Sequence, residues 1–193
     1  MEKIAIVTDN SCDASDAELA ELGVECVHLR VIEPDGTHFP EDNTVENIEA
    51  FYDYIVDCDE LPSTSMPPLL DFAQLYTDLS LAGYTHVISL HISSRMSGTV
   101  HTARMAAESA PIPVEVIDTR CNTVAQFLFV RRIAQLREYG LSFDELVEAA
   151  HELVGKTSIC FMLDKLRNLV KGGRTGKATG LAAALLKIKP LLT

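Results

Sequence analysis

The sequence predicts an α/β protein with a mostly parallel sheet, helices on both faces, and the start of a second, smaller α/β domain. Short apolar runs alternate with segments of helical period, and most runs end in a polar loop. With 193 residues and 47% hydrophobic residues, the chain can bury a sizeable core. We expect an N-terminal domain over residues 1–156 and the beginning of another, truncated domain over residues 157–193.

Four runs are expected to form the sheet because they are apolar, rich in β-branched residues and too short for helices. They span residues 4–7, 24–32, 85–92 and 114–117. The helices between them are predicted from apolar spacing and from start and stop residues, such as Asp13 or Ser15 before the first and Gly23 after it. These helices cover residues 15–22, 44–56, 67–79, 98–108, 124–139 and 143–153.

The last part of the chain is expected to differ from the first. A strand is predicted over 158–163, helices over 166–170 and 181–186, and a strand beginning near Lys189. From Lys165 to Thr193 the sequence has seven Lys or Arg and no acidic residue, whereas the whole chain has a net charge of -12. Such an acidic body repels phosphate backbones and anionic lipid, so nucleic-acid binding through the basic segment is disfavoured.

Cysteine usage and hydropathy indicate a cytoplasmic protein without a metal or a disulfide framework. The five cysteines are scattered and show no Cys-x-x-Cys or Cys/His ligand spacing. The N-terminal apolar run is too short for a signal peptide. No stretch approaches the roughly 20 apolar residues of a membrane span, so stable insertion into a membrane is not expected.

Three segments of small hydroxyl residues are predicted to be loops at the carboxyl edge of the sheet, where ligands of open α/β sheets bind. They are residues 8–11, 63–65 and 93–99, and the last leads straight into a helix. Hydroxyls and helix N-terminal amides without a lysine suit a carboxylate or a single phosphate. The competing interpretation is that these side chains only cap helices and fill turns.

More specific motifs for nucleotide binding or catalysis are not matched by the sequence. A P-loop at residues 171–178 lacks its first glycine and its Ser or Thr. No Gly-x-Gly-x-x-Gly follows the first strand, so a dinucleotide cofactor is not expected. A serine hydrolase using Ser94 and His91, completed by Asp9 or Asp118, stays open as an alternative, since strand ends converge in such folds.

The hydroxyl segments and a glycine-rich segment together resemble one family in order and spacing over the whole chain. The N-terminal part contributes Lys3-Ile4-Ala5-Ile6-Val7-Thr8-Asp9-Asn10-Ser11, Ser63-Thr64-Ser65-Met66-Pro67, Ile92-Ser93-Ser94-Arg95-Met96-Ser97-Gly98-Thr99 and Val116-Ile117-Asp118-Thr119. The closing part contributes Phe161-Met162-Leu163-Asp164-Lys165-Leu166, Lys171-Gly172-Gly173-Arg174-Thr175-Gly176 and Lys187-Ile188-Lys189-Pro190-Leu191-Leu192. These segments resemble the DegV family of bacterial two-domain α/β proteins.

The resemblance implies a non-catalytic protein that holds one long-chain fatty acid between its domains and presents it to a separate fatty acid kinase. It implies no cofactor other than the bound fatty acid. The residues that would bind the acyl carboxylate are Thr64, Ser94, Ser93, Arg95, Ser97 and Gly98. Arg174 would lie near the domain junction and contact the kinase or a phosphate.

Some positions depart from the family pattern. The family often has Gln where Met66 stands and Gly where Arg95 stands. Phe127 occupies a place usually held by a small residue, and it is expected, with Leu128, Leu181 and Leu185, to line an acyl tunnel. Members of the family normally continue beyond the position of Thr193, so we expect the exposed apolar segment 181–192 to pair with a second copy in a homodimer.

Overall fold

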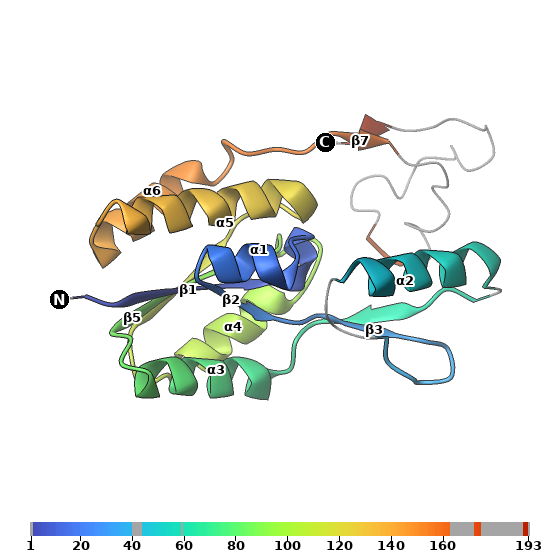
Figure 1. Cartoon of the computed structure of the whole chain (residues 1–193), viewed down its shortest axis with the longest axis horizontal. Helices are drawn as coiled ribbons and strands as arrows, with labels where there is room; N and C mark the ends of the chain where they lie inside the picture. Colours follow the sequence, from blue (N-terminus) through green and yellow to red (C-terminus); the bar gives the residue numbers. More distant parts are fainter. Residues whose placement is uncertain (1, 40–43, 59, 163–171, 175–190, 193) are drawn as a thin grey trace.

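The computed structural model describes residues 2–39, 44–58, 60–162, 172–174 and 191–192 (Figure 1). Its central sheet has four parallel strands in the order β2-β1-β5-β6, which confirms the predicted fold class. The strands are β1 (Ile4–Asp9), β2 (Val24–Val27), β5 (His86–His91) and β6 (Val114–Asp118). Every residue of β1 is buried, as its continuous apolar run predicts.

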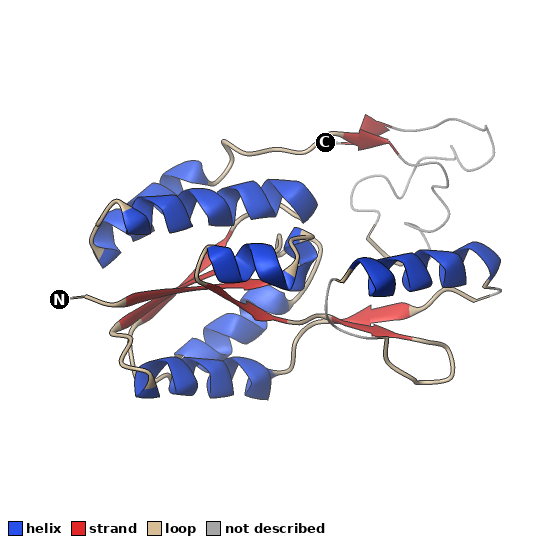
Figure 2. Cartoon of the chain, viewed as in Figure 1, coloured by secondary structure: helices blue, strands red, loops and turns tan. Residues whose placement is uncertain are grey.

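Helices cover both faces of the sheet (Figure 2). On one face lie α1 (Asp16–Glu21), α5 (Thr123–Glu138) and α6 (Phe143–Leu153). On the other lie α3 (Leu69–Leu81) and α4 (Thr99–Ala107). Alternate β1 side chains enter two separate cores: Ile4 and Ile6 pack with α1, α5 and α6, while Ala5 and Val7 pack with α3 and α4.

Two helices begin where the sequence places a capping box. Ser15 and Glu18 cap α1 reciprocally, and Ser142 and Glu145 do the same for α6. Of the two candidate caps for α1, the structure selects Ser15. Asp13 instead adopts a left-handed conformation with φ of 59° at the end of the short 3-10 helix η1 (Asn10–Cys12).

The predicted strand over residues 24–32 is wrong as a single element. It divides into β2 and β3 (Arg30–Ile32), which belong to different sheets. The division falls at Leu29, whose backbone N–H donates to Asn10 Oδ1 at 2.8 Å and whose carbonyl accepts from Asn10 Nδ2 at 3.2 Å. Because the Asn10 side chain is hydrogen-bonded to both backbone groups of Leu29, the pairing of this segment with β1 ends here.

The prediction of a loop at residues 63–65 is also wrong. Ser63–Ser65 form a strand, β4, that pairs antiparallel with β3. Together with α2 (Val45–Asp57), these two strands form a unit beside the main sheet, here called the arm (Figure 1). The arm is tied to the body by an ion pair between Arg30 on β3 and Asp71 on α3, 3.2 Å apart.

The end of the described chain forms a third small sheet, in which β7 (Phe161–Met162) pairs antiparallel with β8 (Leu191–Leu192). The helices expected over 166–170 and 181–186 lie outside the described residues. So do most of the basic segment, Leu181 and Leu185. In the part of the chain that the structure describes, no helix combines the length and the apolar character needed to cross a bilayer.

Candidate ligand cavity

A cavity of about 810 Å³ lies between the arm and the carboxyl end of β5. Strand β4 and the segment before it form one wall, and Ile92, Met96 and Ser97 from the loop after β5 form another. Two residues of the glycine-rich segment, Gly172 and Arg174, complete the described lining. The cavity therefore occupies the edge of the sheet where ligands of this fold class bind.

The loop after β5 folds into a tight turn because its own backbone and hydroxyl groups pair locally. The Ser93 carbonyl accepts from the N–H groups of Met96 at 2.8 Å and Ser97 at 3.2 Å, and Ser93 Oγ accepts from Arg95 N–H at 3.3 Å. Ser97 Oγ accepts from Thr99 N–H at 3.3 Å at the start of α4. This turn brings Met96 and Ser97 to the cavity wall.

The structure brings only some of the predicted site residues to this cavity. Thr64, Ser97 and Arg174 line it, whereas the other four predicted residues are absent from its described lining. Those four are Ser93, which is 6% exposed, and the exposed residues Ser94, Arg95 and Gly98. The sequence-based selection overlooked two methionines of the lining, Met66, which directly follows one hydroxyl segment, and Met96, which lies within another.

Ser94 is hydrogen-bonded to a carboxylate of the protein itself, that of Asp118. Its hydroxyl donates to Asp118 Oδ2 at 2.6 Å, and its backbone N–H donates to Asp118 Oδ1 at 3.2 Å. The Arg120 N–H adds a third bond to Oδ1 at 3.0 Å. The Ser94 hydroxyl hydrogen is thus already directed at an anion, as it would be in a complex with an acyl carboxylate.

Arg174 supplies positive charge to the cavity, and Glu60 supplies the one acidic side chain of the described lining. The guanidinium of Arg174 donates from Nη1 to the Gly172 carbonyl at 2.6 Å, and its Nε lies 3.5 Å from the Met96 carbonyl. These contacts hold the segment 172–174 against the loop after β5. They leave further guanidinium N–H groups for an anionic ligand or partner.

The proposed tunnel residues of α5 lie elsewhere. Phe127 packs partly buried against the core formed by α1, α5 and α6, and Leu128 is 43% exposed. Neither belongs to the described lining of the cavity. In the described ranges of the chain, no group of three or more His, Cys, Asp or Glu side chains could hold a metal ion.

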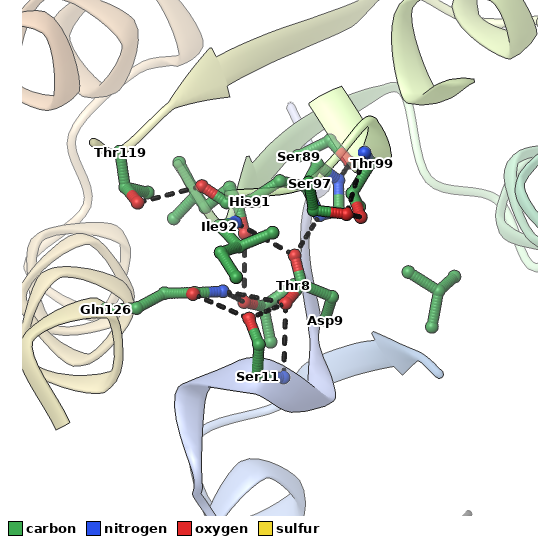
Figure 3. Close-up of polar contacts among 12 residues, drawn as sticks. Thr8, Asp9, Ser11, Ser89, His91, Ile92, Ser97, Thr99, Thr119 and Gln126 are labelled. Atoms are coloured by element: carbon green, nitrogen blue, oxygen red, sulfur yellow. Dashed lines mark hydrogen bonds and ion pairs between the residues drawn. The ribbon is translucent and has the colours of Figure 1, made fainter. Parts of the chain in front are cut away.

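A buried polar network lies beneath the cavity wall (Figure 3). Asp9, at the end of β1, accepts from His91 Nδ1 at 2.9 Å and from the Ile92 N–H at 3.0 Å through Oδ2. Through Oδ1 it accepts from the Ser11 N–H and hydroxyl and from Gln126 Nε2 at 3.2 Å. Asp9 thereby fixes the backbone of Ile92, which lines the cavity.

The pKa of Asp9 reflects two opposing effects. Burial raises it, since the charged form loses its hydration, but hydrogen bonds and charge from His91, with bonds from Ser11 and Ile92, outweigh that effect. The net result is a pKa below the usual value of an aspartate. The carboxylate is therefore ionised in the folded protein at neutral pH.

The structure contradicts the hydrolase alternative, because Ser94 and His91 are not paired with each other. Both ring nitrogens of His91 are engaged, Nδ1 with Asp9 and Nε2 with Ser89 Oγ at 2.6 Å. Ser89, His91 and Asp9 have the order of a hydrolase triad, but all three are 0% exposed. The Tyr76 hydroxyl lies 2.9 Å from Ser89 Oγ and ends this row of hydrogen bonds. No substrate can therefore reach this serine.

Comparison with known proteins identifies one family. The sequence pattern of the family described as "Uncharacterised protein, DegV family" matches residues 3–193. A DegV domain-containing protein of Clostridium acetobutylicum is 32% identical over 194 residues, which cover 100% of this chain and 68% of that protein.

Two solved structures extend the similarity to the fold. The DegV family protein of Thermus thermophilus, described as binding fatty acid, has a TM-score of 0.86 and 32% identity over 99% of this chain and 67% of its own. A stearic acid-binding protein of Eubacterium ventriosum has a TM-score of 0.87 and 28% identity over 98% of this chain and 66% of its own. The chain thus spans about two thirds of the length of these relatives.

Proposed function

Because this chain belongs to the DegV family, we propose that it binds a long-chain fatty acid, with the carboxylate in the cavity between the arm and the loop after β5. The observation that carries the proposal is the convergence of Thr64, Ser97 and Arg174 on that cavity. Two hydroxyls and a guanidinium can each donate to a carboxylate. The cavity volume of about 810 Å³ falls within the range of about 300–1,000 Å³ typical of small-molecule sites.

The energetics favour such a ligand. Each charge-assisted hydrogen bond to the carboxylate contributes roughly 1.5–3 kcal/mol. About 15 methylenes at ~0.8 kcal/mol each set a ceiling of ~12 kcal/mol for the tail. Immobilising the tail reduces this sum. The tail therefore dominates affinity, and the polar groups fix the orientation of the carboxylate.

The remaining predicted contacts belong to the same proposal. Ser93, Ser94, Arg95 and Gly98 would contribute after a local rearrangement, in which the Ser94 hydroxyl turns from Asp118 to the ligand. We further propose that the chain has no chemistry of its own and presents the acyl carboxylate to a separate kinase, which Arg174 contacts. A cytoplasmic location, a domain boundary at residue 156 and a homodimer stay predictions.

The first experiment is mass spectrometry of an organic extract of the purified, denatured chain. We expect a long-chain carboxylic acid, at near one molecule per chain. Titration should show roughly tenfold weaker binding, and the extract should hold less of this acid, when Thr64→Val or Ser97→Ala removes one donor.

Thr77→Val is the matched control, because Thr77 is an exposed threonine whose hydroxyl bonds within α3 to the Ala73 carbonyl. Unchanged affinity in the Thr64→Val, Ser97→Ala double variant would refute the placement of the carboxylate. The kinase role has a separate test, in which the loaded protein, ATP and a bacterial fatty acid kinase should yield acyl phosphate. Formation of acyl phosphate without the kinase would refute the non-catalytic role.

A further inference from the structure

Met66 joins the two walls of the cavity. It follows β4 directly, and it stands two residues after Thr64 in the chain. Its Sδ lies 3.4 Å from the hydroxyl of Thr102 on α4, which donates to it. Thr102 is 7% exposed, so the thioether reaches into the body although Met66 itself is 49% exposed.

The sulfur of Met66 occupies the space where a side chain at position 98 would begin. A β-carbon added to Gly98 would lie 2.6 Å from Met66 Sδ and 3.5 Å from Met66 Cε. The backbone of Gly98 has φ of -75° and ψ of 0°, which any residue can adopt. A side chain at position 98 would therefore have to displace the Met66 thioether, whereas the backbone conformation imposes no restriction.

This contact connects the two hydroxyls that the proposed function assigns to the carboxylate. Thr64 belongs to the arm, whereas Ser97 immediately precedes Gly98 on the body. The Met66 side chain contacts Gly98, so it fills the space between the Thr64 strand and the Ser97 loop. Met66 also lines the cavity itself, together with Met96.

In the proposed complex, Met66 would lie beside the first carbons of the acyl chain, because it lines the cavity two residues after Thr64. Side chains two residues apart along an extended segment lie on the same side, about 6.6 Å apart. A ligand whose carboxylate meets Thr64 would thus pass the Met66 thioether within its first few carbons. In the proposed complex, a substituent on the carbon next to the carboxylate would compete with that thioether for space.

We propose that Met66, seated on Gly98, is the specificity-determining residue of this cavity and restricts it to fatty acids that are unbranched next to the carboxylate. The inference rests on the proposed function, and it adds which acyl chains the site accepts. Gly98→Ala should push the flexible Met66 side chain into the cavity, with little effect on folding because neither backbone nor core must move.

The test is a variant cycle measured with hexadecanoate and 2-methylhexadecanoate. Gly98→Ala should lower the affinity for hexadecanoate roughly tenfold, the effect of one misplaced methyl-sized group. In the Met66→Ala background, the same substitution should change affinity by less than about twofold, because the clash is gone. Met66→Ala alone should raise the affinity for 2-methylhexadecanoate, relative to hexadecanoate, roughly tenfold.

Met105→Ala is the matched control, because Met105 is a similarly exposed methionine, 46%, on α4 and is not part of the described lining. It should leave both affinities and their ratio unchanged. An equal loss on Gly98→Ala in both backgrounds, or an unchanged affinity ratio in Met66→Ala, would overturn the proposal.

A second readout separates this inference from the proposed function. In protein labelled with ¹³C at its methionine methyl groups, Gly98→Ala should shift the Met66 resonance and leave that of Met105 in place. If the unaltered chain binds no fatty acid, the proposed function fails, and a shifted Met66 resonance still supports the seat on Gly98. An unshifted Met66 resonance overturns that seat whether or not a fatty acid binds.

Discussion

Replacing Asp9 by Asn tests the polar network beneath the cavity, because the two carboxylate oxygens accept from different sets of donors. Oδ2 accepts from the Ile92 N–H and from His91, and Oδ1 accepts from Ser11 and Gln126. An asparagine keeps the shape of the side chain but replaces one oxygen by an NH₂ group, which can only donate. Whichever way the amide turns, one backbone N–H, of Ile92 or of Ser11, then faces another donor.

The cost follows from these contacts. A buried donor left without a partner costs about 1–3 kcal/mol, and the remaining bonds change from charge-assisted to neutral, at roughly 1 kcal/mol each. We expect Asp9→Asn to lower the free energy of unfolding by about 3 kcal/mol. Against a total stability of about 5–15 kcal/mol, the variant should fold but unfold at clearly lower denaturant concentration.

The assay is urea unfolding at pH 7 followed by far-UV circular dichroism, because the chain has no tryptophan. Asp118→Asn is the matched control, since Asp118 accepts three hydrogen bonds near the surface, where water can replace them. The control should cost less than about 1 kcal/mol. A loss below about 1 kcal/mol for Asp9→Asn as well would refute the argument that the donors around Asp9 are buried and depend on it.

Three further outcomes are expected. The lowered pKa of Asp9 contributes stability that is present above the unfolded-state value of 3.8 and is lost as pH falls through the folded-state value, so acid unfolding curves should be less steep in Asp9→Asn. Ser142→Ala removes the capping box of α6 and should cost about 1 kcal/mol in thermal or urea unfolding. If Ser94 binds the acyl carboxylate, Asp118→Asn should strengthen fatty acid binding severalfold in a titration, by removing a competing charge worth about 1 kcal/mol near the surface. Unchanged binding would remove Ser94 from the site.

The parallel sheet and its helices could be predicted because local patterns determine them. The fully buried β1 appears as an unbroken apolar run, and α6 begins at a Ser-x-x-Glu capping box. The break between β2 and β3 has no such local signal. It depends on Asn10, which lies 19 residues before Leu29 in the sequence and forms hydrogen bonds with the Leu29 backbone. Contacts of this kind are set by the tertiary fold, and a strand pattern alone does not contain them.

Strand β4 also depends on a contact distant in the sequence, which here creates a strand where the local composition predicts a loop. Ser63–Ser65 has the composition of a turn, since small hydroxyl side chains often bond to nearby backbone. The segment is nevertheless extended because the backbone of β3, more than 30 residues earlier, is available for pairing. Thr64 consequently sits on a strand at the cavity wall, which holds its hydroxyl more firmly than a loop would.

The candidate site could be predicted by residue type but only in part by position, because a hydroxyl binds whichever acceptor the fold brings closest. Ser94 and Ser97 are three residues apart in one loop, yet Ser94 donates to Asp118 and Ser97 lines the cavity with Thr64 and Arg174. Asp118 is an anion, so it repels a second carboxylate on its side of the loop. On the cavity side, the guanidinium of Arg174 adds an attractive charge in a chain whose net charge is -12. In the proposed complex, the acyl carboxylate would therefore lie near the Arg174 charge beside Thr64 and Ser97, and Ser94 would join only by giving up its hydrogen bonds to Asp118.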